Sequence, residues 1–264
     1  MLSAGDLLTA EGLADRQRDL DLRTTAERAA ADRTWTFGHV VVDEAQELSP
    51  MAWRLLVRKC PTRSMTVVGD VAQTGTLAGA DRWAEVLDPH ARGLWRLEEL
   101  TVNYRTPAEI MAVAADVLAA GGTGLTPPRS VREGGEHPEA VRVGEAELPD
   151  KAAAWAAERA AAHEGTLAVI VPPSRVAAVA AALSAALPGV TSGPAADSAR
   201  GPVVVTPTEA KGLEFDSVLL VDPQGVLDEG VRGRNDLYVA LTRATQRLGV
   251  LTPGDLPAEL ARLG

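Results

Sequence analysis

One stretch decides the fold: His39-Val40-Val41-Val42-Asp43-Glu44-Ala45-Gln46-Glu47-Leu48-Ser49-Pro50. Its three consecutive valines predict a short apolar strand of the kind that is buried on both faces of a parallel sheet. Asp43 and Glu44 then lie at the carboxyl end of that strand, the edge at which open α/β sheets bind ligands. There Asp43 can hold Mg²⁺, and Glu44 can orient or deprotonate a water. Taken alone, a solvated acidic turn explains these two residues equally well.

Composition sets the class of protein. The chain has 264 residues, of which 46% are hydrophobic, so it can form one large or two small domains with a sizeable core. No apolar run approaches the ~18 residues needed to span a bilayer, and the N-terminus lacks the features of a secretion signal. The single cysteine, Cys60, suits a reducing compartment, and we expect a cytoplasmic protein with no membrane partner. The net charge of −10 excludes a generic polyanion binder, so any nucleic-acid contact needs a local basic groove.

The residues on either side of the valine strand predict helices. Residues 11–21 mix both signs of charge, which is typical of an exposed helix, while Trp35 and Phe37 are expected to pack beside the strand. After the strand, Ser49 is expected to cap a helix with proline at its first position. The apolar face of this helix should consist of Met51, Leu55 and Leu56.

A second buried strand follows over residues 64–68 and ends in Gly69-Asp70. Strand, helix and strand form a βαβ unit, so the two strands should be adjacent and parallel. Gln73 lies three residues beyond this strand end and can reach a ligand bound along the same edge. Without other motifs, an ordinary polar loop is the better explanation of Gln73.

Residues 94–100 suggest another strand, and Asn103-Tyr104-Arg105-Thr106-Pro107 follows. Thr106 and Glu109 match a capping box that opens a helix with Pro107 at its first position. The buried face of this helix should carry Ile110, Val113, Val117 and Leu118. The ring of Tyr104 beside the guanidinium of Arg105 suits a nucleobase and a phosphate, although a surface pair at a helix start is simpler.

The second half of the chain alternates between strands and helices. After a loop over residues 121–137, we expect strands at 140–143, 166–171, 203–206, 218–221 and 248–251, and helices at 151–163, 174–187 and 236–244, the second of them capped by Ser174. This pattern predicts a second α/β layer sandwich. A polar, glycine-containing turn joins two of its strands over residues 206–216. Arg243 stands on an otherwise apolar helix and needs an anionic partner, either Asp236 nearby or a phosphate held between two domains.

Five motifs, in this order, resemble those of superfamily 1 helicase motors of the UvrD/Rep type: Asp-Glu-Ala-Gln (43–46), Gly-Asp-x-x-Gln (69–73), Asn-Tyr-Arg-Thr-Pro (103–107), Lys-Gly-Leu-Glu-Phe-Asp (211–216) and Tyr-Val-Ala-Leu-Thr-Arg-Ala (238–244). The resemblance covers roughly residues 35–252, and the ordered set is far more specific than any single motif. Within this group the sequence around Asp43 and Asp70 is most similar to that of the actinobacterial HelD type, which are motors that work on RNA polymerase.

The resemblance implies a fold and an organisation. It implies RecA-like parallel sheets flanked by helices, of the P-loop NTPase class, with residues 1–93 as the C-terminal part of an incomplete first domain and residues 94–264 as the second. It also implies ATP and Mg²⁺ as ligands. The partners that it implies are RNA polymerase and, more weakly, DNA.

The resemblance also implies a role for each motif residue. Asp43 would hold Mg²⁺, and Glu44 would activate the attacking water. Gln46 and Gln73 would sense the γ-phosphate, and Tyr104 would stack on adenine. The remaining contacts to phosphate and ribose would come from Arg105, Gly212, Glu214 and, as an arginine finger, Arg243.

Three departures from the family pattern qualify these roles. No Gly-x-x-x-x-Gly-Lys-Ser/Thr loop is present, so we expect an N-terminal motor half that carries the P-loop, and no ATP hydrolysis by this chain alone. The interval between Thr106 and Thr206 is too short for the large inserted domain of the unwinding enzymes. Residues 75–78 lack the aromatic side chains that stack on DNA bases, and Thr208 replaces a histidine that often contacts DNA.

Three hypotheses therefore stand: a HelD-type ATPase that remodels RNA polymerase, a fragment of a UvrD-type DNA helicase, and a non-catalytic remnant.

Overall fold

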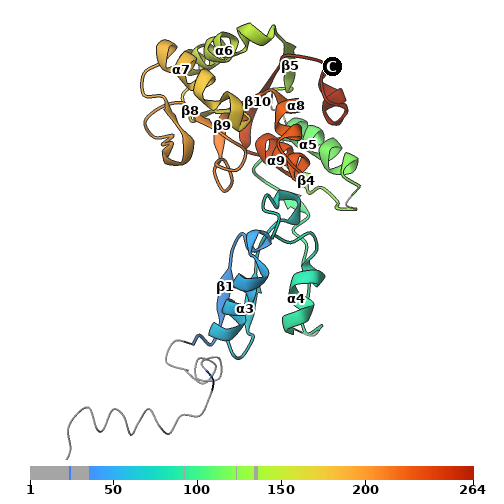
Figure 1. Ribbon diagram of the computed structural model, residues 1–264. Helices are drawn as coiled ribbons and strands as arrows, with labels where there is room; N and C mark the ends of the chain where they lie inside the picture. The colour runs from blue at the N-terminus through green and yellow to red at the C-terminus, as the bar shows by residue number, and fades with distance from the viewer. Residues whose placement is uncertain (1–23, 25–35, 92, 123, 134–135) are drawn as a thin grey trace, which may run out of the picture.

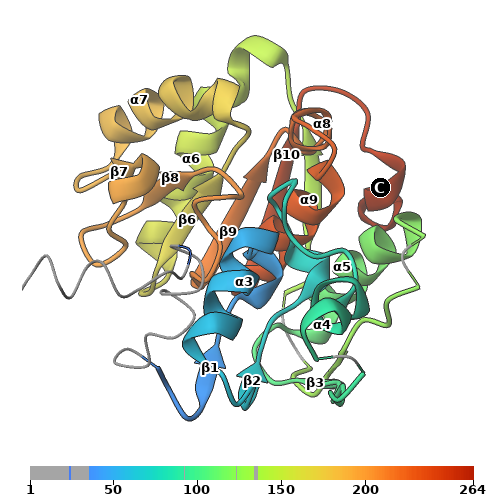
Figure 2. The same cartoon turned by 60° about the horizontal axis from the view of Figure 1, so that its bottom comes forward.

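The computed structural model describes residues 24, 36–91, 93–122, 124–133 and 136–264. These residues form a small lobe (residues 36–91) and a large lobe (residues 102–264), and Figure 1 shows the small lobe, with α3 and α4, below the large one. Figure 2 turns the bottom of this view forward, so that the small lobe lies in front of the large one.

The small lobe is built on the valine strand. Strand β1 (Val40–Val42) pairs in parallel with β2 (Met65–Val67), so the two predicted strands are adjacent and parallel. Short 3₁₀ turns follow each strand, η2 (Ala45–Glu47) and η3 (Val71–Gln73), and the helices are α3 (Pro50–Lys59) and α4 (Trp83–Ala91). The hydroxyl of Ser49 accepts a hydrogen bond from the N–H of Ala52 at 3.3 Å, which confirms the predicted cap of α3.

The small lobe has a core on one face only. Val42 and Trp53 are buried there against Leu56 and Trp83. The predicted apolar face of α3 is therefore confirmed for Leu56 and wrong for Met51 and Leu55, which are exposed. The opposite face is bare: Val41, in the middle of β1, is 68% exposed.

The approach to β1 also differs from the prediction. Phe37, which was expected to pack beside the strand, is 56% exposed. Trp35 and the helix predicted over residues 11–21 lie outside the described residues.

The large lobe contains a six-stranded sheet in the order β5-β10-β9-β6-β8-β7, and all five neighbouring pairs are parallel. The strands are β5 (Glu139–Arg142), β6 (Leu167–Ile170), β7 (Thr191–Ser192), β8 (Val203–Val205), β9 (Phe215–Val221) and β10 (Ala244–Thr252). The three predicted strands β8, β9 and β10 therefore lie in one sheet, as expected, with β6 between β8 and β9.

Helices cover both faces of this sheet. One face packs against α5 (Ala108–Ala120), α8 (Pro223–Asp228), α9 (Gly233–Thr242) and the 3₁₀ turn η7 (Ala258–Leu263), the other against α6 (Leu148–Ala162) and α7 (Val176–Ala186). Successive side chains of β9 alternate between these layers, because a strand has a period of two: Val218 and Leu220 join the first core, Leu219 and Val221 the second. The mixed α/β fold with a parallel sheet flanked by helices is the predicted class.

Several predicted details of the large lobe and its approach are wrong. Residues 94–100 form no strand, and Leu94 and Leu100 are 90% and 87% exposed. Residues 121–137 are not all loop, because β4 (Arg129–Ser130) pairs with β3 (Val102–Asn103). Helix α7 begins at Val176 with no side-chain cap, so Ser174 lies in the preceding 3₁₀ turn.

Helix α5 begins one residue later than the predicted capping box requires. The residue that caps α5 is Pro107, and no side chain makes a capping hydrogen bond there. Instead, the side-chain oxygen of Asn103 accepts the N–H groups of Arg105 and Thr106 at 2.8 and 3.1 Å, which holds these residues in a turn before the helix. The predicted buried face of α5 is confirmed, because Ile110, Val113, Val117 and Leu118 are all buried. Within the described ranges, no helix is both long and apolar enough to cross a membrane.

Candidate active site

The two acidic residues after β1 stand in a strained turn. Glu44 adopts a left-handed conformation, with φ 50° and ψ 35°, which is uncommon for a residue other than glycine and is found disproportionately at functional sites. Its N–H donates to Oδ1 of Asp43 at 2.9 Å, and both residues are exposed. The turn therefore presents two carboxylates to solvent at the carboxyl end of the small lobe's sheet.

The donor set at Asp43 suits Mg²⁺ only in part. A carboxylate oxygen is the ligand type that this ion prefers. Over the part of the chain that the structure describes, no group of three or more His, Cys, Asp and Glu side chains could hold a metal alone. Mg²⁺ at Asp43 would therefore take its other ligands from water and phosphate, as it usually does where one or two carboxylates hold it.

A chain of hydrogen bonds leads from Glu44 into the lobe. Nε2 of Gln46 donates to Oε2 of Glu44 at 2.6 Å, and Oε1 of Gln46 accepts the N–H of Asp70 at 3.1 Å. Oδ2 of Asp70 accepts Nε2 of Gln73 at 2.9 Å, and Oε1 of Gln73 accepts Nη2 of Arg243 at 3.1 Å. The chain thus joins the predicted water-activating residue of the small lobe to the predicted arginine finger of the large lobe.

Gln46 is fully buried at 0% exposure, so its contacts are Glu44 and Asp70 and not the exposed surface of the turn. A Cβ on Gly69 would approach Oε1 of Gln46 to 2.3 Å, so the amide sits directly against that glycine. The structure therefore gives Gln46 the position of a support for the Glu44 carboxylate. Direct sensing of a phosphate, the role that the resemblance implies for Gln46 and Gln73, stays a prediction for both residues, and Gln73 is only partly buried.

Arg243 is held by neutral acceptors. It is 5% exposed, and besides Gln73 it donates to the carbonyl oxygens of Val239 and Leu213, each at 3.2 Å. Among the described residues no carboxylate lies within 4.0 Å of its guanidinium, so the local pair with Asp236 does not form. Burial, with the nearby positive charge of Arg105, lowers the pKa of Arg243, whereas Glu214 acts in the opposite direction.

Arg105 and Glu214 form an ion pair on the large lobe. Nε of Arg105 lies 2.7 Å from Oε1 of Glu214. Glu214 directly precedes β9, and Arg243 directly precedes β10, so the amino ends of two neighbouring strands present these groups. Gly212 has φ +71°, a backbone conformation that favours glycine, and Tyr104 is 73% exposed.

The structure thus brings most of the predicted site residues together. Glu44, Arg105 and Glu214 all act electrostatically on Arg243, which itself contacts Gln73. Asp43 adjoins Glu44 and Gln46 supports it. Tyr104 and Gly212 flank residues of the cluster in sequence, and their contacts with a ligand remain predictions.

Sequence reasoning missed the other contacts between the lobes. Nζ of Lys211, the first residue of the motif at 211–216, lies 2.7 Å from Oε1 of Glu47, which directly follows the motif at 43–46. Arg232 pairs with Asp81, and Nδ2 of Asn235 donates to the carbonyl oxygen of Val71 at 3.3 Å. No spacing rule pairs residues so far apart in sequence.

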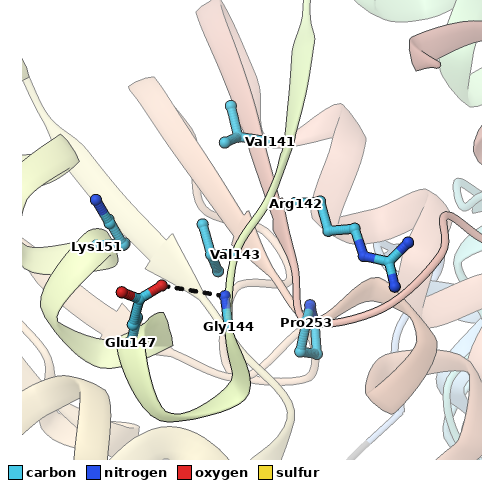
Figure 3. Close-up of a pocket in the computed structure, with 7 residues that line it drawn as sticks. All are labelled: Val141, Arg142, Val143, Gly144, Glu147, Lys151 and Pro253. Carbon is cyan, nitrogen blue, oxygen red and sulfur yellow. Dashed lines mark hydrogen bonds between the residues drawn. The ribbon is translucent and has the colours of Figure 1, made fainter.

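A surface hollow lies elsewhere, at the carboxyl end of the edge strand β5. It encloses about 560 Å³ beside Val143, Lys151 and Pro253. Figure 3 shows that the guanidinium of Arg142 points away from Lys151, and its charge is already paired with Asp255 at 2.6 Å. The hollow contains none of the predicted site residues, and its polar groups do not converge, so the chemistry points to the contact between the lobes instead.

Residues 203–251 match the family model described as the UvrD-like helicase C-terminal domain. This segment runs from β8 to β10 and contains the last two of the five motifs. A search of curated proteins finds no match to the chain.

Among solved structures, the C-terminal domain of a possible DNA helicase from Lactobacillus plantarum WCFS1 is 24% identical, with a TM-score of 0.49, over 61% of this chain and 94% of that one. Arterivirus nonstructural protein 10 (helicase) is 20% identical, with a TM-score of 0.46, over 86% of this chain and 41% of that one. The same viral helicase in complex with DNA is 19% identical, with a TM-score of 0.43, over 82% of this chain and 40% of that one. The chain therefore spans about two fifths of the length of the viral helicase.

Proposed function

We propose that this chain is the C-terminal motor portion of a superfamily 1 ATP-dependent helicase or translocase, which binds ATP between the small and large lobes. The observation that supports this most strongly is the hydrogen-bond chain from Glu44 to Arg243. It links the two groups that ATP hydrolysis needs from opposite sides of the phosphate, and it crosses from one lobe to the other.

Each group has a distinct task in this proposal. Glu44, oriented by Gln46, accepts a proton from the attacking water. Arg243, now bonded to the neutral oxygen of Gln73, supplies positive charge to the phosphoryl group as it transfers. Mg²⁺, held by Asp43, would supply further charge neutralisation when bound. Gln73 couples the nucleotide to the position of Arg243, because its side-chain oxygen can turn to another donor only after Arg243 has left it.

The exposed face of β1–β2 supports the proposal that further structure completes the small lobe. A valine in mid-strand is normally buried in a parallel sheet, yet Val41 is 68% exposed. A P-loop segment packed there would supply the backbone cradle and the lysine that hold the β- and γ-phosphates. Without it, this chain is expected to bind nucleotide weakly through Tyr104 and Arg105 and to hydrolyse none.

The test compares the 264-residue chain with a longer one that includes the upstream coding segment. Nucleotide binding should tighten, and Mg²⁺-dependent ATP turnover should appear, only in the longer protein. In it, Glu44→Gln should abolish turnover and retain ATP binding, and Arg243→Ala should slow turnover by about 10³ or more. Arg262→Ala, in an ion pair remote from the site, is the matched control. Normal turnover by Glu44→Gln would show that another residue is the base.

We propose RNA polymerase as the partner of the complete protein, as in HelD-type motors. Two observations support it: the net charge of −10, which repels a phosphate backbone, and the lack of aromatic residues after Gln73, where Leu77 stands 80% exposed. Co-purification with RNA polymerase, together with little strand displacement on a tailed DNA duplex, is the expected result. Strong unwinding without polymerase association would favour the UvrD-type DNA helicase instead.

A further inference from the structure

The contact between the lobes has a charged centre that the proposed function does not use. Oε1 of Glu47 accepts Nζ of Lys211 at 2.7 Å and the N–H of Gly75 at 2.9 Å. Glu47 and Gly75 belong to the small lobe and Lys211 to the large lobe. The two charged side chains are only 16% and 23% exposed, so solvent screens this pair less than an ordinary surface ion pair.

Gly75 lets the lysine reach this position. A Cβ built on Gly75 would lie 1.9 Å from Nζ and 3.0 Å from Cε of Lys211, so any side chain there would displace the ammonium group. The same hypothetical Cβ lies 3.5 Å from Oδ1 of Asp236, near the start of α9. Lys211 therefore lies between an acidic group of the small lobe and one of its own lobe.

Asp236 is not satisfied where it stands. Its Oδ1 is buried and has no hydrogen-bond partner among the described residues. An unpaired carboxylate oxygen is costly in such a place. Helix α9 carries Asp236 near its start and ends at Thr242, directly before Arg243, so a movement of the helix that satisfies Asp236 also moves the guanidinium.

We propose that Lys211 is a positioning residue: its pair with Glu47 holds the large lobe where Arg243 meets Gln73, and Asp236 is the acceptor to which it turns when the lobes separate. The effect on turnover rests on the proposed function, whereas the exchange of partners does not. A measurement of the distance between the lobes therefore tests the exchange even if the chain never binds ATP.

The surroundings of Asp236 make the exchange depend on pH. Facing it are Lys211 from the loop after β8, Glu47 from η2, Glu229 at the end of α8 and Arg232 at the start of α9. Burial raises the pKa of Asp236 from 3.8 to about 6. Separation of the lobes returns water to the carboxylate, so ionised Asp236 favours the separated state, and the closed fraction should fall as pH rises from about 4 through about 6.

The experiment places spin labels on exposed positions of α3 and α7, using Arg54→Cys and Ser184→Cys with Cys60→Ala, and records the distance distribution of the 264-residue chain. Glu47→Gln and Lys211→Gln should each raise the ratio of separated to closed molecules about tenfold, which corresponds to a coupling of about 1.4 kcal/mol. The double variant should resemble either single one. Asp116→Asn, which breaks an ion pair of the same length within the large lobe, is the matched control and should change nothing.

Two further arms keep the outcome decisive if a variant folds poorly. The spin-labelled chain that keeps Glu47, Lys211 and Asp236 should show a closed fraction that falls as pH rises. Asp236→Asn should remove this dependence on pH. The exchange Glu47→Lys with Lys211→Glu, made together with Asp236→Asn, should restore the closed state. The proposal is overturned if folded Glu47→Gln and Lys211→Gln keep the parent distribution, if their effects simply add, or if the pH profile is flat.

Discussion

Replacing Asp236 by Asn should stabilise the protein above about pH 4, and most fully above about pH 6. The carboxyl group has a folded-state pKa of about 6 against an ordinary value of 3.8, chiefly because it is buried. A group whose pKa is raised by folding contributes stability in full below its unfolded value and loses it as pH rises through the folded value. The complete difference corresponds to about 3 kcal/mol at 1.36 kcal/mol per pH unit. Because part of the side chain meets solvent, about 1–2 kcal/mol is the expected gain of Asp236→Asn at pH 7.5.

The assay is thermal unfolding at pH 5 and pH 7.5, with a shift of about 2–4 °C per kcal/mol for a chain of this size. Asp236→Asn should raise the midpoint at pH 7.5 more than at pH 5. Asp116→Asn is a control of opposite sign, because Arg262 lowers the pKa of Asp116 and the pair stabilises the protein as pH rises. A lower midpoint for Asp236→Asn at pH 7.5 would refute the reasoning, since it would mean that Lys211 needs the negative charge of Asp236 in the folded state.

Two further substitutions probe packing and charge. Gly69→Ala should destabilise the small lobe by about 1–3 kcal/mol, because the new Cβ would lie 2.3 Å from Oε1 of Gln46. Gly38→Ala, which meets nothing within 4 Å, should change stability by less than about 0.5 kcal/mol; tryptophan fluorescence during urea unfolding compares the two. Arg175→Met should cost about 3 kcal/mol, since the carboxylate of Asp222, only 6% exposed, loses a partner at 2.5 Å. Arg175→Lys, which keeps the charge, should cost less, and equal losses for Met and Lys in calorimetry would show that the charge is immaterial.

The buried strands could be predicted from the sequence because their apolar runs are continuous. Val203–Val205 and the core of β9 have no other stable place than a sheet covered on both sides, whereas Val40–Val42 forms its strand with one face covered and Val41 68% exposed. Residues 94–100 interrupt their apolar residues with Arg96, Glu98 and Glu99 and form no strand, and Leu94 and Leu100 stay exposed. Periodicity measures the tendency of a segment to be buried, and the tertiary structure decides whether there is a place to bury it.

The sequence predicts the candidate site as a list of residues and not as a set of contacts. Motif order identified Glu44, Gln73, Arg105 and Arg243, and all four gather where the lobes meet. The partners of these groups were not predictable, because each contact joins segments whose relation is fixed only by the assembled lobes. Arg243 shows this best: the sequence predicts an anionic partner for its guanidinium, and in the structure it donates to carbonyl and amide oxygens.

The strand order of the large lobe dictates when that lobe can form during synthesis. Strand β10 is the last strand of the chain, yet it lies between β5 and β9. Until residues 244–252 have emerged from the ribosome, β5 has no neighbour and the edge of β9 is open. The small lobe pairs β1 with β2 across residues 43–64, which include α3, and all of this segment precedes the large lobe in the chain, so the small lobe can assemble earlier. A nascent chain stalled before residue 244 would therefore carry a folded small lobe and an unfinished large lobe, a natural target for chaperones.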